Sequence, residues 1–185
     1  MFAVSATGQD ADEAFNLMKD TISSLLQRYD SSNIRYGLLI YGSDAITVSH
    51  LQNHTDVDKM KEELTTVKPP VGPSAVNVAL EAAGKMFSEA EDRRDADRAL
   101  VILTDRNSLA DDDVVLNATQ PLEKMAVKII VVAVSDEVNP AGFKDVTNKE
   151  NIIETKIDKE PEDLGYEVME RVISKCILRQ LLLEV

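Results

Sequence analysis

One carboxylate and several hydroxyl groups occur where this sequence predicts strands to end. Asp105 follows the apolar run 99–104, while the segment Ser5–Gln9 and Ser74 lie in two other turns. Because ligands of open α/β sheets bind at the carboxyl ends of the strands, we expect these oxygen-bearing side chains to form one binding site. The sequence shows no nucleophile–base pair, Walker-type loop or Gly-x-Gly-x-x-Gly turn. We therefore predict a protein that binds a ligand and is not an enzyme.

The elements that must position this site alternate between strand and helix. Strands are predicted over 2–5, 34–41, 46–51, 98–104, 127–134 and 152–155, and helices over 12–28, 56–67, 74–86, 111–125, 140–147 and 160–182. The two consecutive strands 34–41 and 46–51 are predicted to form a hairpin. The order implies a three-layer, doubly wound α/β fold with a mostly parallel six-stranded sheet, one antiparallel edge strand and helices on both faces. Ser74 is expected to cap the helix that follows it.

Length and composition bound the domain organisation and the partners. The chain has 185 residues, 44% of them hydrophobic, which fits one domain over residues 1–182. Residues 183–185 match a remnant of an engineered protease site and are given no functional role. The net charge of −13 disfavours nucleic acid and anionic membranes as partners. No apolar stretch is long enough to insert across a bilayer.

The order and spacing of these segments resemble the von Willebrand factor type A, or integrin I-like, domain family over nearly the whole chain. The first loop of that family falls on Ser5-Ala-Thr-Gly-Gln9, its second on Pro73-Ser-Ala-Val-Asn-Val-Ala-Leu80, and its third on Leu100-Val-Ile-Leu-Thr-Asp-Arg-Asn-Ser108. The segment Ile34–Asp44 is similar to the second strand of the family and the turn after it. The resemblance implies a Rossmann-like fold whose loops form a metal-ion-dependent adhesion site.

In that family the three loops hold Mg²⁺ or Mn²⁺, and an acidic side chain of a partner completes the coordination. The resemblance assigns Ser5, Thr7, Gln9, Ser74 and Asp105 to the metal loops. Ser5 stands where the family has Asp and Gln9 where it has Ser, so one negative charge is lost and attraction for a divalent cation falls. Two interpretations stay open. Either the site no longer holds metal and Asp105 is bound by hydroxyls and backbone N–H groups, or it binds Mg²⁺ or Mn²⁺ weakly.

The function that the resemblance implies is protein binding, in adhesion or in an extracellular matrix. The binding face would be the rim at the carboxyl ends of the parallel strands, where Arg106 and Asn107 are expected to contact the partner. An extracellular or cell-surface location is expected, and an intracellular assembly subunit of the same fold is the alternative. An enzyme on a doubly wound sheet is the third possibility, and turnover of a small substrate at the rim would support it.

Three further signals bear on location and metal chemistry. Asn53 and Asn117 begin N-glycosylation sequons and favour a secreted glycoprotein, the second more weakly because it lies in a predicted helix. His50 and His54 have no neighbouring Cys or carboxylate set, so a zinc site is not expected there. Cys176 is the only cysteine, which excludes an internal disulfide but not pairing outside the chain.

Overall fold

The computed structural model describes residues 1–29, 34–51, 56–90, 96–107 and 110–173. Its elements in chain order are β1 (Phe2–Ser5), α1 (Ala11–Arg28), β2 (Leu38–Tyr41), β3 (Ala45–Ser49), α2 (Val57–Thr66), α3 (Val76–Glu89), β4 (Arg98–Thr104), α4 (Asp112–Lys124), β5 (Val127–Val134), the 3₁₀ helices η2 (Pro140–Phe143) and η3 (Lys149–Asn151), β6 (Ile152–Thr155) and α5 (Pro161–Val172). None of the helices in these ranges is both long and apolar enough to cross a membrane.

The six strands form one sheet in the order β3-β2-β1-β4-β5-β6. Every neighbouring pair is parallel except β2 and β3, which pair antiparallel at one edge. The order of the parallel strands reverses between β1 and β4, and such a switch point is where open sheets bind ligands. The predicted fold class is confirmed.

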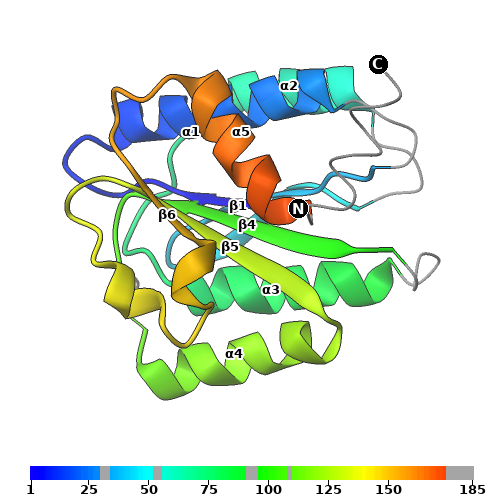
Figure 1. Ribbon diagram of the computed structural model, residues 1–185, viewed down its shortest axis with the longest axis vertical. Coiled ribbons are helices and arrows are strands. Elements are labelled where there is room, and N and C mark those ends of the chain that lie inside the picture. The colour runs from blue at the N-terminus through cyan, green and yellow to red at the C-terminus, as the bar shows by residue number, and fades with distance from the viewer. Residues whose placement is uncertain (30–33, 52–55, 91–95, 108–109, 174–185) are drawn as a thin grey trace.

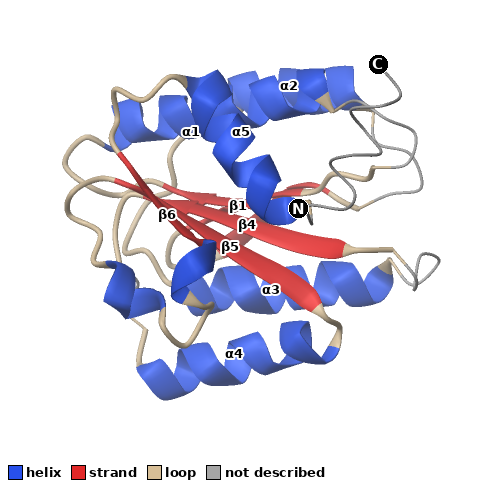
Figure 2. Ribbon diagram, viewed as in Figure 1, coloured by secondary structure: helices blue, strands red, loops and turns tan. Residues whose placement is uncertain are grey.

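Two apolar cores hold the helices against the sheet. Helices α1, α2 and α5 cover one face, and α3 and α4 cover the other (Figure 1). The central strands β4 and β5 carry long runs of Val, Ile and Leu because they are buried on both faces, as parallel strands in such a sheet must be. The colouring by secondary structure shows the strands as a single layer between the two helical layers (Figure 2).

The element bounds predicted from sequence were right for β1, β4, β5 and β6 and wrong in two places that matter here. Strand β2 begins at Leu38 and not at residue 34. Its neighbour β1 begins at Phe2, which pairs with Leu38, so earlier residues have no strand residue of β1 to pair with. The chain before β2 packs instead through Tyr36, whose ring stacks on Phe2 at 6.1 Å between centroids.

The second wrong prediction is that Ser74 caps the helix after it. Helix α3 begins at Val76, its N-cap is Ala75, and no side chain caps it. Ser74 is buried instead and receives a hydrogen bond from Ser5 at 3.4 Å. In contrast, Asp56 caps α2, because its carboxylate accepts the Lys59 N–H at 3.0 Å. The predicted helix 140–147 is only the four-residue 3₁₀ helix η2. The last predicted helix, 160–182, is α5, which ends at Val172 with Ile173 as its C-cap, and residues 174–182 lie outside the described ranges.

Candidate functional site

Polar side chains from four segments meet at the carboxyl edge of the central strands. Ser5 ends β1, Tyr41 ends β2, Asp105 follows β4, and Ser74 lies just before α3. All four side chains are nearly or fully buried. Buried polar groups in a protein need hydrogen-bond partners, so the partners of each one decide what the site can do.

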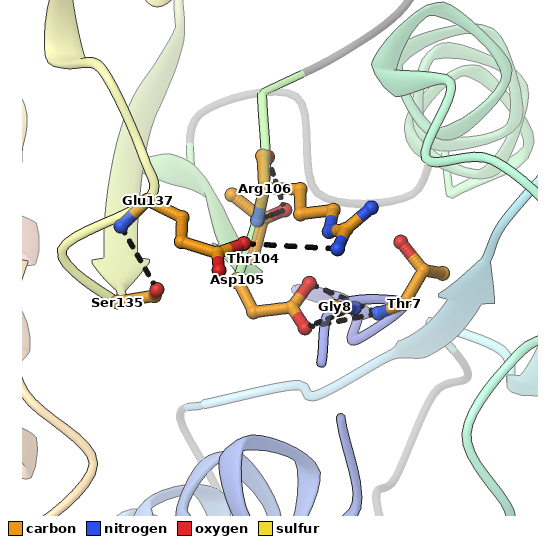
Figure 3. A network of polar contacts seen from close by, with 7 residues as sticks. All are labelled: Thr7, Gly8, Thr104, Asp105, Arg106, Ser135 and Glu137. Atoms are coloured by element: carbon orange, nitrogen blue, oxygen red, sulfur yellow. Dashed lines mark hydrogen bonds and ion pairs between the residues drawn. The ribbon is translucent and has the colours of Figure 1, made fainter. Parts of the chain in front are cut away.

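The carboxylate of Asp105 is bound by the backbone of the β1–α1 loop. The N–H of Thr7 donates to both carboxylate oxygens at 3.0 Å, and the N–H of Gly8 donates to Oδ2 at 2.6 Å. Figure 3 shows the carboxylate facing these two amides. Hydrogen bonds from N–H groups to a buried carboxylate are among the stronger ones in proteins. Asp105 therefore fastens the loop after β1 to the end of β4.

Gly8 is required for this contact. A Cβ atom at position 8 would lie 2.7 Å from Oδ2 of Asp105, a distance that real Cβ atoms do not adopt. The close approach of backbone to carboxylate thus depends on the missing side chain.

Four hydroxyl groups of the site differ in their hydrogen bonding. The Ser5 hydroxyl donates to that of Ser74, whereas Oγ1 of Thr7 and the hydroxyl of Tyr41 are buried without any hydrogen-bond partner among the described residues. Burial raises the pKa of Tyr41 to about 12, and the nearby hydroxyls of Thr104 and Ser74 partly oppose this rise without making a well-formed hydrogen bond. The site therefore contains two buried hydroxyls that a bound water or ligand atom could satisfy.

The loop after β4 is held to the loop after β5. The Asn107 side chain donates to the Asn139 carbonyl at 2.7 Å and accepts the Asn139 N–H at 2.6 Å. Asn139 in turn caps η2 by accepting the Ala141 N–H at 3.0 Å. Since both ends of its amide are in use, Asn107 positions this edge of the rim.

Arg106 lies over the carboxylate and faces Glu137 (Figure 3). One guanidinium nitrogen is 3.7 Å from a carboxylate oxygen of Glu137, and the two side chains are 46% and 54% exposed. Next to this pair is a cavity of about 20 Å³, lined by residues that include Gln9, Asp10, Asp105 and Ser135. It is large enough for about one water molecule.

The residues predicted for the site behave differently from one another. Ser5, Ser74 and Asp105 gather at its centre, Thr7 contributes its backbone N–H, and Gln9 is exposed and lines the small cavity. The prediction missed the contributions of Gly8, Tyr41 and Glu137. The glycine in the first loop was a usable signal, whereas a tyrosine that ends an apolar run looks like any other core residue.

The two sequons differ in what the structure says of them. Asn53 and His54 lie outside the described residues, as does Cys176. Asn117 is exposed within α4, but Thr119 of the same sequon is fully buried and its hydroxyl donates to the Val115 carbonyl at 2.9 Å. In the folded domain this second sequon is not an extended, accessible segment.

A comparison with known families decides the identity of the fold. Residues 1–165 match the family model of the von Willebrand factor type A domain. The chain belongs to this family. Among solved structures, this von Willebrand factor type A domain is similar to proximal thread matrix protein 1 from the mussel byssus with a zinc-occupied MIDAS motif (TM-score 0.75, 18% identity, 90% of this chain and 43% of that one).

Two other solved structures place the domain among diverse proteins of the same fold. One is the manganese-loaded TRAP protein of Plasmodium vivax (TM-score 0.73, 13% identity, 94% of this chain and 72% of that one). The other is an aerotolerance-related membrane protein from Bacteroides fragilis (TM-score 0.72, 16% identity, 93% and 96%). The domain spans less than half of the mussel protein. At these identities the likeness shows the fold alone.

The oxygens of this von Willebrand factor type A domain fit a divalent ion poorly in the arrangement described. Mg²⁺ prefers six oxygens near ~2.1 Å in octahedral geometry. Here the single central carboxylate, Asp105, already accepts three hydrogen bonds from two backbone N–H groups, and the Ser5 hydroxyl is directed at Ser74. Within the described ranges, His, Cys, Asp and Glu side chains nowhere form a group of three that could hold a metal. An ion would have to compete with these hydrogen bonds.

Proposed function

We propose that this domain is a protein-binding module that engages its partner through the rim around Asp105. The observation that carries the proposal is the fastening of three loops into one surface. Asp105 joins the loops after β1 and β4, and Asn107 joins the loops after β4 and β5. A rim whose loops are already ordered loses little conformational entropy when it binds. Protein interaction is also the general role of the family to which the chain belongs.

We further propose that the module acts without a metal ion, since the hydrogen bonds to Asp105 compete with any cation. The sequence also allowed another interpretation, in which the site binds Mg²⁺ or Mn²⁺ weakly and a partner's acidic side chain strengthens the binding. That interpretation stays a prediction, and the same experiments test both. The absence of enzyme activity likewise stays a prediction, and turnover of a small substrate at the rim would contradict it.

A place in an extracellular or cell-surface protein is part of the proposal, supported by the matrix protein among the structures of similar fold. The intracellular assembly subunit remains the alternative. Mass spectrometry of the natively expressed protein separates the two. A glycan on Asn53 would support the extracellular location, and a protein that is unmodified at both Asn53 and Asn117 in its native host would favour the intracellular one.

Site-specific photo-crosslinking in cells tests whether the partner binds at the rim. A photoreactive residue is placed at Gln9, which is exposed beside the site, or at Lys128 as a control. Lys128 is exposed at the start of β5, at the end of the strand away from the rim. In cells that express the protein, a discrete protein should be captured from position 9 and not from position 128. Equal capture from both positions, or capture from position 128 alone, would contradict a partner at the rim.

A further inference from the structure

Arg106 has a hydrogen-bonded backbone and a half-exposed guanidinium at the rim. Among the described residues the guanidinium has one ion-pair contact, with Glu137, and at 3.7 Å this contact is beyond hydrogen-bond distance. Among the described residues the guanidinium donates no hydrogen bond, whereas the backbone N–H and carbonyl of Arg106 are both bonded to the Thr104 hydroxyl. A planar fork of five N–H donors is therefore presented at the rim by a backbone that is fixed.

The position of Arg106 sets it apart from the other cations of the rim. Lys144 lies 3.2 Å from the Asp112 carboxylate and Lys159 lies 2.9 Å from that of Glu167, whereas Lys156, like Arg106, lies 3.7 Å from its partner, Asp136. Arg106 stands over Asp105 and next to Gly8, since a Cβ at position 8 would be 3.3 Å from its Nε. The carboxylate of Asp105 beneath it accepts the backbone N–H groups of Thr7 and Gly8.

Resting on the proposed function, we infer that Arg106 binds a carboxylate side chain of the partner, in the place that Glu137 occupies when the domain is free. Arginine suits this role because its fork matches both oxygens of a carboxylate at once. Glu137 is 54% exposed and can turn into solvent when the partner's carboxylate replaces it. The recognised group is an Asp or Glu side chain whose flanking residues are neutral or basic.

The charge around Arg106 determines which residues can flank the partner's carboxylate. The domain has a net charge of −13, Glu137 faces the guanidinium, and Asp10 lines the small cavity that Glu137 also lines. A segment that carried several acidic residues would be repelled at long range, whereas one acidic residue between basic or neutral ones would be attracted. The partner is thus expected to present an isolated carboxylate.

Peptide selection tests this assignment. A phage-displayed library of random 12-residue peptides is selected on the domain in EDTA at 0.15 M NaCl, and the enriched sequences are made as fluorescent peptides with amidated C-termini. Enrichment of a single Asp or Glu, and binding that survives amidation, is the expected result. Peptides without an enriched acidic residue, or binding that needs a free C-terminal carboxylate, would overturn the inference.

Matched variants then separate Arg106 from general charge effects. We expect Arg106→Gln to weaken binding at least about tenfold and Arg106→Lys to restore it only in part, because lysine lacks the fork. Glu137→Gln should strengthen binding about threefold by removing the internal competitor. Lys156→Gln is the control, since Lys156 also pairs at 3.7 Å with a neighbouring carboxylate, that of Asp136, and should change affinity less than about twofold.

The outcomes distinguish this inference from the proposed function. Equal weakening by Arg106→Gln and Lys156→Gln would overturn the role of Arg106 and leave only general electrostatic attraction. Photo-crosslinking from position 9 that persists in Arg106→Gln at full strength would also overturn it, while it would keep the rim as the binding face. Selected peptides that crosslink only from position 128 would contradict the proposed function itself.

Discussion

At the scale of single residues, the site is built around one carboxylate and the backbone that approaches it. Asp105 could be found from the sequence because an acidic residue after a long apolar strand is conspicuous. Its hydrogen bonds to the N–H groups of Thr7 and Gly8 could not, because backbone orientation in a loop is not encoded in side-chain type. The same limit hid the role of Tyr41, which in sequence is one more apolar residue of β2.

Two glycine substitutions test the contact between loop and carboxylate. Gly8→Ala should destabilise the domain by about 1 to 3 kcal/mol, because the new methyl group would lie 2.7 Å from Asp105 Oδ2 and displace a buried hydrogen bond. Gly84→Ala is the control, since its Cβ would meet its nearest neighbour at 3.9 Å within a helix, and it should be neutral or stabilising by up to about 1 kcal/mol. Urea denaturation measures both. Equal effects of the two changes would argue against the contact.

The buried hydroxyl of Tyr41 predicts an alkaline effect. Tyrosine in the unfolded chain loses its proton near pH 10, whereas burial raises the pKa of Tyr41 in the folded state to about 12. Between these values the unfolded state ionises first, so stability is lost as pH rises, by about 2 to 3 kcal/mol from this group. Tyr41→Phe should therefore be less sensitive than the wild type between pH 10 and 12. At pH 7 it should be as stable or slightly more so, because the lost hydroxyl has no hydrogen-bond partner among the described residues.

The free energy of unfolding of the wild type and of Tyr41→Phe is measured at pH 7 and pH 11. Subtracting the two pH effects removes the contribution of the other titrating groups. A variant that loses more than about 1 kcal/mol at pH 7 would show that the hydroxyl is satisfied by a bound water or ligand.

At the scale of elements, long apolar runs were predicted better than turns and caps. Strands β1, β4 and β5 have the predicted bounds because their side chains are largely apolar, and β6 does although only Ile152 and Ile153 of its four residues are apolar. The start of β2 depends on where β1 offers partners, and the start of α3 depends on Ser74 turning toward β1. Both are tertiary effects, which a local pattern does not contain.

The two hydrogen bonds from Asn107 that join the loop after β4 to the loop after β5, called the clamp here, can be tested at the scale of elements. Asn107→Ala removes both hydrogen bonds to Asn139 and should lower stability by about 1 to 2 kcal/mol. It should also increase hydrogen exchange of the Asn139 and Ala141 amides, because the cap of η2 loses its support. Asn148→Ala serves as control, since the Asn148 side chain caps no N–H of η3. Unchanged exchange at residues 139 and 141 in Asn107→Ala would contradict the clamp.

At the scale of the whole molecule, one sheet with a core on each face implies one cooperative unit. The two cores share the central strands, whose alternate side chains point into one or the other. We predict that tyrosine near-ultraviolet dichroism and far-ultraviolet dichroism give coincident unfolding curves, as expected of a two-state domain. Tyr36 and Tyr41 belong to different cores and so report on both. Separate transitions would mean that the two helical layers unfold independently.

The central claim is that Asp105 fastens the rim internally and is not engaged as a ligand of a metal ion. Its most direct test is a thermal melt of the wild type and of Asp105→Asn, each in EDTA and in millimolar Mg²⁺, Mn²⁺ or Ca²⁺. We predict that the substitution lowers the melting temperature in every buffer, and that metal changes the wild-type value by less than about 1 °C. A metal-dependent rise of several degrees in the wild type that is absent in Asp105→Asn would contradict the account and restore the metal site.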